Sequence, residues 1–171
     1  MRLYRGLCAA FVSLFLVTVV AACGSDDTPA VDTWESKGAT GSISVTPPSG
    51  DTAPKISVST PYSVTETQVH VLTEGSGAVV ADTAEVRVNY LGVNGRDGQE
   101  FDSSYGRGTP AEFPLNGVIP GFSKAIAGQK VGSTVVVSIA PADGYTSGQP
   151  SAGIQAGDTL VFVIEILDVV S

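Results

Sequence analysis

The chain has 171 residues, of which 43% are hydrophobic, and its 17 acidic residues outnumber the 9 basic ones to give a net charge of −8. This composition suits one globular domain with appendages rather than a disordered chain. It argues against nucleic acid as a partner, because phosphate binding needs clustered Lys and Arg and the basic residues here are scattered.

The first 22 residues have the pattern of a secretory signal peptide. Arg2 and Arg5 precede an uncharged apolar run over residues 6–20, and two alanines then lead to Cys23. The letters Val-Ala-Ala-Cys resemble the bacterial lipobox, in which the cysteine receives a lipid and becomes the mature N-terminus. An uncleaved membrane anchor is the alternative interpretation. We expect an exported lipoprotein, held on the extracytoplasmic side of a membrane through Cys23.

The exported part should contain neither a disulfide bond nor a metal site. Cys8 leaves with the signal peptide and Cys23 carries the lipid, so no cysteine pair remains. His70 is the only histidine. One histidine supplies too few ligands for zinc, and its place on a predicted strand argues against a Ser-His-Asp triad.

Residues 23–53 are predicted to form a flexible tether. They are rich in Ser, Thr, Pro, Gly and Asp, and they contain too few apolar side chains to offset the entropy of an ordered chain. Trp34 and the alternating pair Ile43 and Val45 are exceptions, for which we expect a short local contact.

From residue 54 onward the pattern is that of a largely antiparallel sheet. Strands are predicted where apolar and polar residues alternate or β-branched residues run together, at residues 56–58, 69–71, 86–90, 134–139 and 160–167. The last run is apolar on both faces, which predicts a central strand. Residues 94–100 are predicted to be a hairpin turn, since they lack the alternating oxygen ligands of a calcium loop.

One short helix is predicted to begin at Pro120, which suits a first helical position, and to end at Gly128. Phe122, Ala125 and Ile126 share one face of it. A helix this short is unstable alone in water, so the sheet should wrap onto it with Phe122 facing inward.

The segment between residues 101 and 122 combines turn-forming residues with side chains too apolar to leave in water, at about 1.5–3 kcal/mol each for full burial. These side chains are Phe101, Phe113, Val118, Ile119 and Phe122. A loop that must fold inward predicts the wall of a hydrophobic cleft.

Several motifs follow one another in the order and near the spacing of one family. They are Val86-Arg-Val-Asn-Tyr-Leu-Gly92, Phe101-Asp-Ser-Ser104, Phe113-Pro-Leu115, Val118-Ile-Pro-Gly-Phe122, Gly128-Gln-Lys-Val-Gly132, Ile139-Ala-Pro141, Gly144-Tyr145 and Thr159-Leu-Val-Phe162. In these motifs the chain resembles the FKBP-type peptidylprolyl isomerases, the immunophilins that bind macrolides such as rapamycin. The resemblance covers residues 69–170.

The resemblance implies an α+β fold in which an antiparallel half-barrel of five or six strands wraps around one short helix. From the change of sequence pattern after the tether, we expect this domain to span residues 54–171. The resemblance implies a monomeric peptidylprolyl cis-trans isomerase that acts on Xaa-Pro bonds of exported proteins and needs no cofactor. The implied partners are proline-containing polypeptides, with rapamycin-type macrolides as candidate ligands.

The resemblance also implies the site residues. Those with catalytic roles are Tyr90, Phe101, Asp102, Tyr145 and Phe162. The substrate-binding positions are Val118, Ile119, Phe122, Ile154 and Arg107, the last as the partner of Asp102. Phe122 would form the floor of the proline site, while the Ile119 N–H and the Tyr145 hydroxyl would bind substrate carbonyls.

The sequence departs from the family pattern at several of these places. Ala111 replaces a usual aromatic residue, Phe122 replaces the usual Trp, and the late Ile-Pro-Pro signature becomes Ile154-Gln-Ala. The intact aromatic positions favour an enzyme. The changes favour the alternative, a weakly catalytic or non-catalytic module or chaperone that binds proline segments, and a purely structural lipoprotein is a third interpretation.

Overall fold

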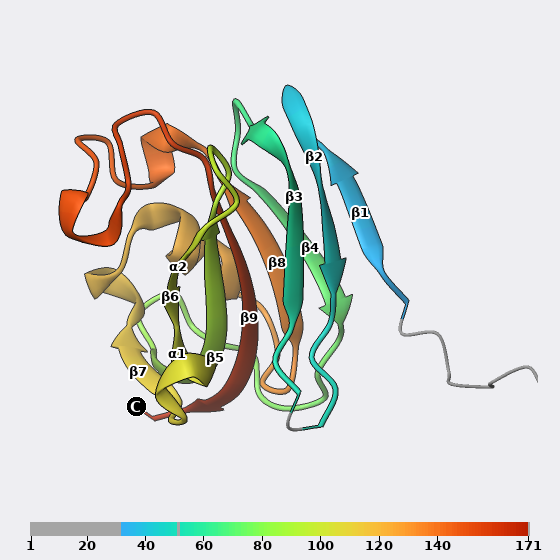
Figure 1. Ribbon diagram of the computed structural model, residues 1–171. Coiled ribbons are helices and arrows are strands. Elements are labelled where there is room, and N and C mark those ends of the chain that lie inside the picture. The colour runs from blue at the N-terminus through green and yellow to red at the C-terminus, as the bar shows by residue number, and fades with distance from the viewer. Residues whose placement is uncertain (1–31, 51, 171) are drawn as a thin grey trace, which may run out of the picture. The chain divides into compact units, whose positions relative to one another are not determined.

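The computed structural model describes residues 32–50 and 52–170, so the predicted signal peptide and Cys23 lie outside the described part of the chain. The described residues form two antiparallel sheets, one of three strands and one of six, together with short helices (Figure 1). None of the helices in these two ranges is long and apolar enough to cross a membrane.

The smaller sheet consists of β1 (Trp34–Lys37), β2 (Thr40–Thr46) and β3 (Lys55–Ser63), in that order. Its first two strands lie within the predicted flexible tether, so that prediction is wrong for residues 34–46, and the folded part begins before residue 54. The physical reason is the alternation on β2: Ile43 and Val45 are 1% and 0% exposed, whereas the serines beside them lie on the other face. These two side chains pack against Val136, Val161 and Val163 of the larger sheet, which stabilises β2 as a strand.

The larger sheet has the strand order β4-β8-β9-β5-β6. Its strands are β4 (Gln68–Thr73), β8 (Thr134–Ile139), β9 (Leu160–Val169), β5 (Glu85–Asn94) and β6 (Glu100–Ser103). The sixth strand, β7 (Ala111–Pro114), pairs with the first half of β5. All the pairings are antiparallel, which confirms the predicted FKBP-like α+β fold.

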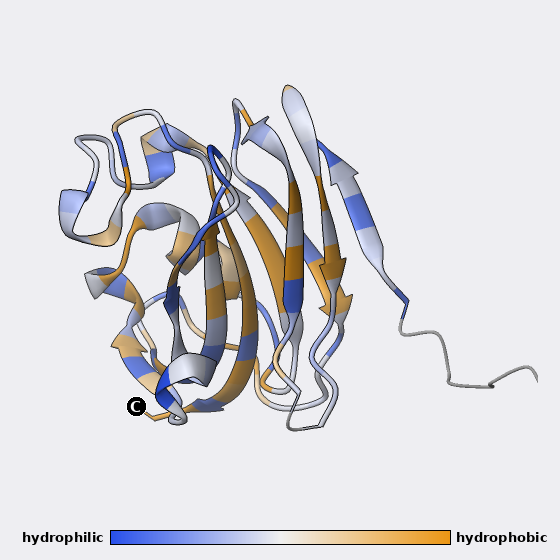
Figure 2. Ribbon diagram, in the orientation of Figure 1, coloured by the Kyte–Doolittle hydropathy of each residue, from blue (hydrophilic) through white to orange (hydrophobic). Residues whose placement is uncertain are grey.

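Strands β8 and β9 separate two hydrophobic cores. Val135 and Ile164 point to one side, where they pack with the helix, and Val136 and Val163 point to the other side, where the smaller sheet covers them. Figure 2 shows the resulting hydrophobic colour along β5, β8 and β9. The prediction that the last apolar run is a central strand is confirmed, since β9 pairs with both β8 and β5.

Helix α2 (Pro120–Ile126) occupies the concave side of the larger sheet, as predicted, with Phe122, Ala125 and Ile126 buried. Gly121 lets it approach β8 closely, because a β-carbon at that position would lie 2.4 Å from Ile139 Cγ2. The other helical segments are α1 (Ser104–Arg107) and the 3₁₀ turns η1 (Leu115–Gly117), η2 (Pro141–Asp143) and η3 (Pro150–Ala152).

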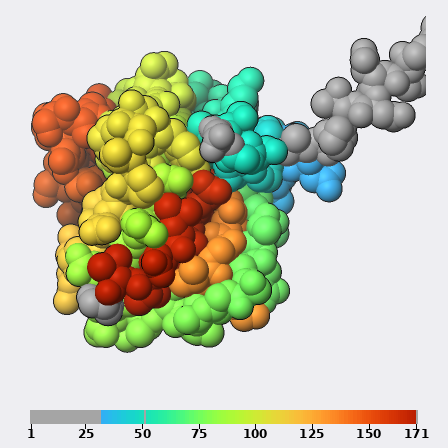
Figure 3. Space-filling view, turned by 90° about the horizontal axis from the view of Figure 1, so that it is seen from below, coloured from blue at the N-terminus to red at the C-terminus, as the bar shows by residue number. Residues whose placement is uncertain are grey.

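Aromatic and polar contacts join the two sheets as well as apolar packing. The rings of Trp34 on β1 and His70 on β4 are stacked, with their centroids 4.7 Å apart and their planes 14° from parallel. The hydroxyls of Tyr62, at the end of β3, and Ser138, on β8, form a buried hydrogen bond of 2.8 Å. Figure 3, which views the domain from below, shows the last residues of β9 at the surface beside the segment around α1.

Candidate active site

A cleft of about 280 Å³ lies between α2 and the sheet strands that face it. It is lined by Tyr90, Phe101, Asp102, Phe113, Gly117, Val118, Ile119, Phe122, Tyr145 and Phe162. All but Asp102 and Gly117 are apolar or aromatic. A cavity of this kind suits an apolar ring with a few polar atoms at its edge.

Phe122 stands at the centre of the aromatic lining. Its ring meets those of Tyr90, Phe113 and Phe162 edge to face, at centroid distances of 5.9, 5.8 and 5.3 Å. Phe101 extends the group, since its ring meets that of Phe162 at 5.4 Å and 89°. Edge-to-face packing is the favoured arrangement of such rings, so each one holds its neighbours in place.

Two of these rings depend on a glycine. A β-carbon on Gly92, in β5, would lie 2.7 Å from the ring of Phe162 and 2.8 Å from the ring of Phe101. Gly92 pairs with both Phe162 on β9 and Asp102 on β6. The two phenyl rings can therefore meet above β5 only because this residue has no side chain.

The polar edge of the cleft is formed by Asp102 and Tyr90, with Arg107 bound to both from behind. The Tyr90 hydroxyl donates a 2.5 Å hydrogen bond to Asp102 Oδ2, and Arg107 forms an ion pair with the same carboxylate. Arg107 Nη2 also donates to the Tyr90 hydroxyl oxygen at 2.7 Å, with the guanidinium 5.4 Å from the ring centroid. Arg107 is the last residue of α1, whose first turn is capped by Ser103.

This network fixes the charge state of the edge. Burial raises the pKa of the Tyr90 hydroxyl to about 12, and the hydrogen bond to Asp102 acts in the same direction. Burial alone would raise the pKa of Asp102 too, but the hydrogen bonds from Tyr90 and Arg107 and the charge of Arg107 outweigh it, so this pKa is lowered. At neutral pH Tyr90 is therefore a hydrogen-bond donor and Asp102 is an anion.

Two further donors face the cleft without a protein acceptor. Ile119 is extended, with φ −60° and ψ 146°, as expected before Pro120, and its N–H makes no hydrogen bond within the described residues. The Tyr145 side chain lines the cleft, and its hydroxyl likewise has no hydrogen-bond partner among the residues that the structure describes. Both groups are free to bind a carbonyl oxygen.

The structure brings together eight of the predicted site residues as cleft-lining groups. They are Tyr90, Phe101, Asp102, Val118, Ile119, Phe122, Tyr145 and Phe162. Arg107 lies behind the edge and reaches the cleft only through Asp102 and Tyr90. The predicted lipid attachment site, Cys23, is not among the described residues.

Ile154 is a correction, because it does not line the cleft. Its side chain is 2% exposed and belongs to the hydrophobic core, and its backbone pairs with Gln149. Ile154 therefore contributes to the packing of the core rather than to the surface of the cleft.

Two lining residues were not among the predicted site positions, Phe113 and Gly117. Phe113 could have been found, since the apolar character of the 101–122 segment already singled it out. Gly117 contributes only backbone, for which the sequence gives no signal. In the two described ranges, no three His, Cys, Asp or Glu side chains are placed to hold a metal ion.

The fold and the cleft together define an FKBP-like domain, a half-barrel with an aromatic pocket against its helix. The model of the family described as FKBP-type peptidyl-prolyl cis-trans isomerase matches residues 77–167, just over half of the chain. The chain therefore belongs to this family.

Relatives and solved structures agree with that assignment. The FKBP-type 22 kDa peptidyl-prolyl cis-trans isomerase of Escherichia coli K12 is 44% identical over 102 residues, which cover 60% of this chain and 49% of the relative. A probable FK506-binding protein of Corynebacterium glutamicum is 43% identical over 96 residues, which cover 54% of this chain and 78% of that protein. This chain thus spans about half of the first relative and about three quarters of the second.

Among solved structures, FkpA from Escherichia coli matches with a TM-score of 0.55 and 40% identity, over 60% of this chain and 47% of that one. A peptidyl-prolyl cis-trans isomerase from Pseudomonas syringae matches with a TM-score of 0.54 and 30% identity, over 60% and 74% of the two chains. The family match begins after β3, so the smaller sheet lies outside it.

Proposed function

We propose that the protein catalyses cis-trans isomerisation of Xaa-Pro peptide bonds. The observation that carries the proposal is the ring-lined cleft, with Phe122 at its centre and the free Ile119 N–H and Tyr145 hydroxyl at its edge. Xaa-Pro bonds are suitable substrates because both isomers are populated and uncatalysed exchange takes tens to hundreds of seconds.

The chemistry follows from the electronic structure of the amide. Rotation about the C–N bond loses resonance, which sets a barrier of about 18–20 kcal/mol. The planar amide separates charge between nitrogen and oxygen and is more polar than the twisted amide. An apolar cleft therefore favours the twisted form over the planar one, and this difference in binding lowers the barrier. No covalent step is needed.

Each lining group has a role in this mechanism. The pyrrolidine ring packs on Phe122, between Tyr90, Phe101 and Phe162. The Ile119 N–H and the Tyr145 hydroxyl bind carbonyl oxygens on the two sides of the rotating bond and so hold the peptide while it turns. Asp102, charged and tied to Arg107, holds the Tyr90 ring in its position as a wall.

The substrates we propose are proline-containing segments of exported polypeptides, bound by a monomer. The aromatic cleft supports proline-containing segments as substrates, and the signal-like N-terminal sequence supports exported polypeptides as their source. Macrolides of the rapamycin type are proposed as competing ligands, because the chain is similar to a protein named as a probable FK506-binding protein.

An isomerisation assay on a peptide of the type Ala-Leu-Pro-Phe tests the activity, with and without rapamycin. We expect the full chain to accelerate exchange and rapamycin to abolish the acceleration. Rapamycin binding without any acceleration of exchange would identify the protein as a binding module rather than an enzyme. Ala111 favours this outcome, because β7 has no aromatic side chain at that position. Neither binding nor acceleration would overturn the proposal.

We further propose that lipid on Cys23 anchors the mature protein to a membrane. The lipobox-like sequence supports this, and several acyl chains give stable anchoring where a single chain is marginal. Cys23→Ala should abolish metabolic labelling with fatty acid, whereas Cys8→Ala, in the predicted signal peptide, should leave it unchanged. Labelling that survives Cys23→Ala would contradict the proposal.

A further inference from the structure

The β5–β6 hairpin carries Phe101 and Asp102 into the cleft, and β6 is an edge strand that pairs only with β5. An edge strand of four residues has little holding it in place by itself. The position of these two cleft residues therefore depends on what holds the end of the hairpin.

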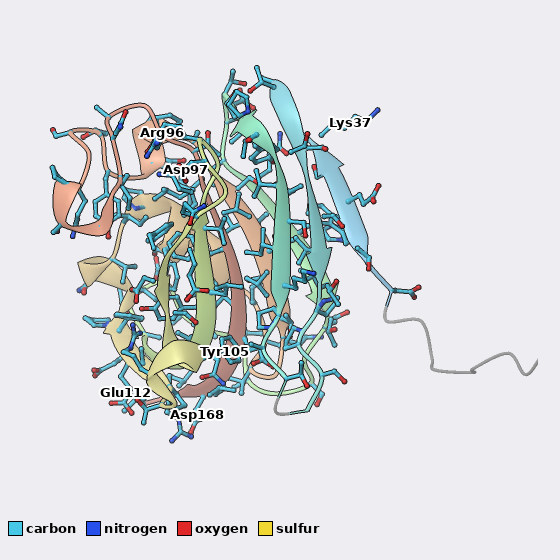
Figure 4. The ribbon with its side chains drawn as sticks, in the orientation of Figure 1. Lys37, Arg96, Asp97, Tyr105, Glu112 and Asp168 are labelled. Carbon is cyan, nitrogen blue, oxygen red and sulfur yellow. The ribbon has the colours of Figure 1, made fainter. Side chains whose placement is uncertain are left out.

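One side of the hairpin end is held by the loop before β9. Arg96 forms an ion pair with Asp158 and donates to the Gly153 carbonyl at 3.0 Å, and Asn94 Nδ2 donates to Asp158 Oδ2 at 2.6 Å. Figure 4 shows Arg96 and Asp97 at this end of the domain, far from Tyr105 on α1. These contacts lie within the family-matched region.

The other side is held by the smaller sheet, which the family match does not include. The Tyr62 N–H donates a 2.8 Å hydrogen bond to the Gly95 carbonyl in the hairpin turn. A β-carbon on Gly98 would lie 3.5 Å from Thr60 Cγ2 and 3.7 Å from Val58 Cβ, so the turn rests directly on β3. In Figure 1 the connection between β5 and β6 lies beside β3.

Tyr62 is itself fixed on both sides. Its side chain is 1% exposed, and its hydroxyl is bonded to Ser138 on β8. Just beyond it, the Val64 N–H donates to Thr159 Oγ1 at 3.1 Å, while the Thr159 carbonyl accepts from the Gly95 N–H at 2.8 Å. Tyr62 and Thr159 thus tie β3, the hairpin end and β9 into one junction.

We propose that Tyr62 is a positioning residue for the cleft, through which the smaller sheet sets where Phe101 and Asp102 stand. When this junction is loosened, the hairpin visits positions in which the cleft is incomplete. Substrate then binds only the molecules with a complete cleft. The apparent dissociation constant rises in inverse proportion to the fraction of such molecules, and turnover at saturation stays largely unchanged. The kinetic part of this inference rests on the proposed isomerase activity.

The test compares Tyr62→Phe with a matched control in the full chain. Tyr62→Phe removes only the hydroxyl bonded to Ser138. Val45→Ala shortens a side chain of the same core, 0% exposed, on a strand that makes no hydrogen bond to the hairpin. The readouts are hydrogen exchange of the hairpin amides Asn94 and Gly98 and the separate values of kcat and KM.

For Tyr62→Phe we expect hairpin exchange to accelerate and KM to rise by up to about two- to thirteenfold, the range of one hydrogen bond, with kcat within about twofold. For Val45→Ala we expect a lower melting temperature with KM and hairpin exchange unchanged. Unchanged exchange in Tyr62→Phe, or equal acceleration in Val45→Ala, would overturn the inference, as would an unchanged KM. If the wild type shows no isomerase activity, the proposed function fails and hydrogen exchange alone decides this inference.

A second pair guards against misfolding of the first variant. Thr159→Val removes the hydroxyl that accepts from Val64, and Thr159→Ser keeps it. We expect Thr159→Val to accelerate hydrogen exchange of the hairpin amides, and Thr159→Ser to leave their exchange as in the wild type. Equal behaviour of the two variants would count against the junction.

Discussion

At Phe122 the helix meets the sheet, and its ring contacts three other aromatic rings of the cleft. Its 4% exposure shows that it is also a core residue. The same ring therefore serves stability and binding, so Phe122 is a poor place to measure catalysis alone. The residues around it separate the two roles better.

Three substitutions should rank the cleft residues by their contribution to kcat/KM. Tyr145→Phe removes one hydrogen bond, worth about 0.5–1.5 kcal/mol, and should lower kcat/KM by about two- to thirteenfold. Phe101→Ala removes the ring packed on Phe162, a loss of about 3–5 kcal/mol divided between folding and the transition state, and should lower it by more than about a hundredfold. Asp102→Val should fall between them.

The measurement is isomerisation of a proline peptide, with folding checked by circular dichroism. A Phe101→Ala variant that stays folded and keeps nearly full activity would show that this cleft is not the catalytic one. Activity losses in the reverse order would show that carbonyl binding, rather than the shape of the cleft, controls the rate.

The ionisation of the cleft edge predicts how stability depends on pH. The lowered pKa of Asp102 means that its contribution is complete above its usual value, near pH 4, and is lost as the pH falls through the lowered pKa. The Tyr90 pKa of about 12 means that its contribution is complete below about pH 10 and is lost as the pH rises through 12.

Urea unfolding of wild type and Asp102→Asn checks the acid side. We expect the wild type to have the higher free energy of unfolding at pH 6 and the difference to shrink toward pH 3, because protonated Asp102 can no longer pair with Arg107. A difference that stays constant over this range would contradict the ionic role of Asp102.

At the scale of elements, α2 depends on its close approach to β8. Gly121→Ala would place a methyl group against Ile139 and should destabilise the domain by about 1–3 kcal/mol through overpacking. Gly106→Ala is the matched control, because a β-carbon there meets nothing nearer than 4.0 Å. Thermal unfolding should show a lower melting temperature for Gly121→Ala and an unchanged or slightly higher one for Gly106→Ala. Equal melting temperatures would contradict the close packing.

The sequence was sufficient for α2 and for the turn between β5 and β6, because Pro120, Phe122 and the Asn-Gly pair at residue 94 act locally. It did not predict β6 itself, whose residues were assigned to the loop that lines the cleft. It was insufficient for β1 and β2, whose residues are mostly polar and which become stable only by covering another sheet. Other residues did indicate that a second layer was needed. Val136, Val161 and Val163 make β8 and β9 apolar on the face away from the helix, and an apolar face of this kind must be covered by other residues. The prediction that Ile154 lines the cleft was wrong, because the resemblance does not show whether this side chain reaches the cleft or the core.

At the scale of the whole molecule, two cores share one sheet. The helix side holds the cleft, and the other side is covered by a sheet that begins before the family match. The folded unit is therefore larger than the isomerase domain that the sequence predicted, and its stability depends on both sides.

Truncation should show this dependence. Removing residues 1–53 exposes the core that Ile43 and Val45 cover, a loss of about 3–6 kcal/mol for two buried side chains, comparable with the total stability of many domains. We expect a chain that starts at residue 54 to melt at a much lower temperature or to aggregate, whereas a chain that starts at residue 32 should melt like the full protein. Equal melting temperatures for the two truncated chains would show that the smaller sheet is dispensable.

The stacked pair of Trp34 and His70 has an optical consequence. Trp34 is the only tryptophan in the chain, and its ring lies on His70 at the contact between the two sheets, while the aromatic residues that line the cleft are Phe and Tyr. Tryptophan fluorescence should therefore stay silent when a ligand enters the cleft and change when the smaller sheet leaves the larger one. An emission spectrum would then distinguish separation of β1 from β4 from occupation of the cleft, so Trp34 is a built-in reporter of the contact between the two sheets.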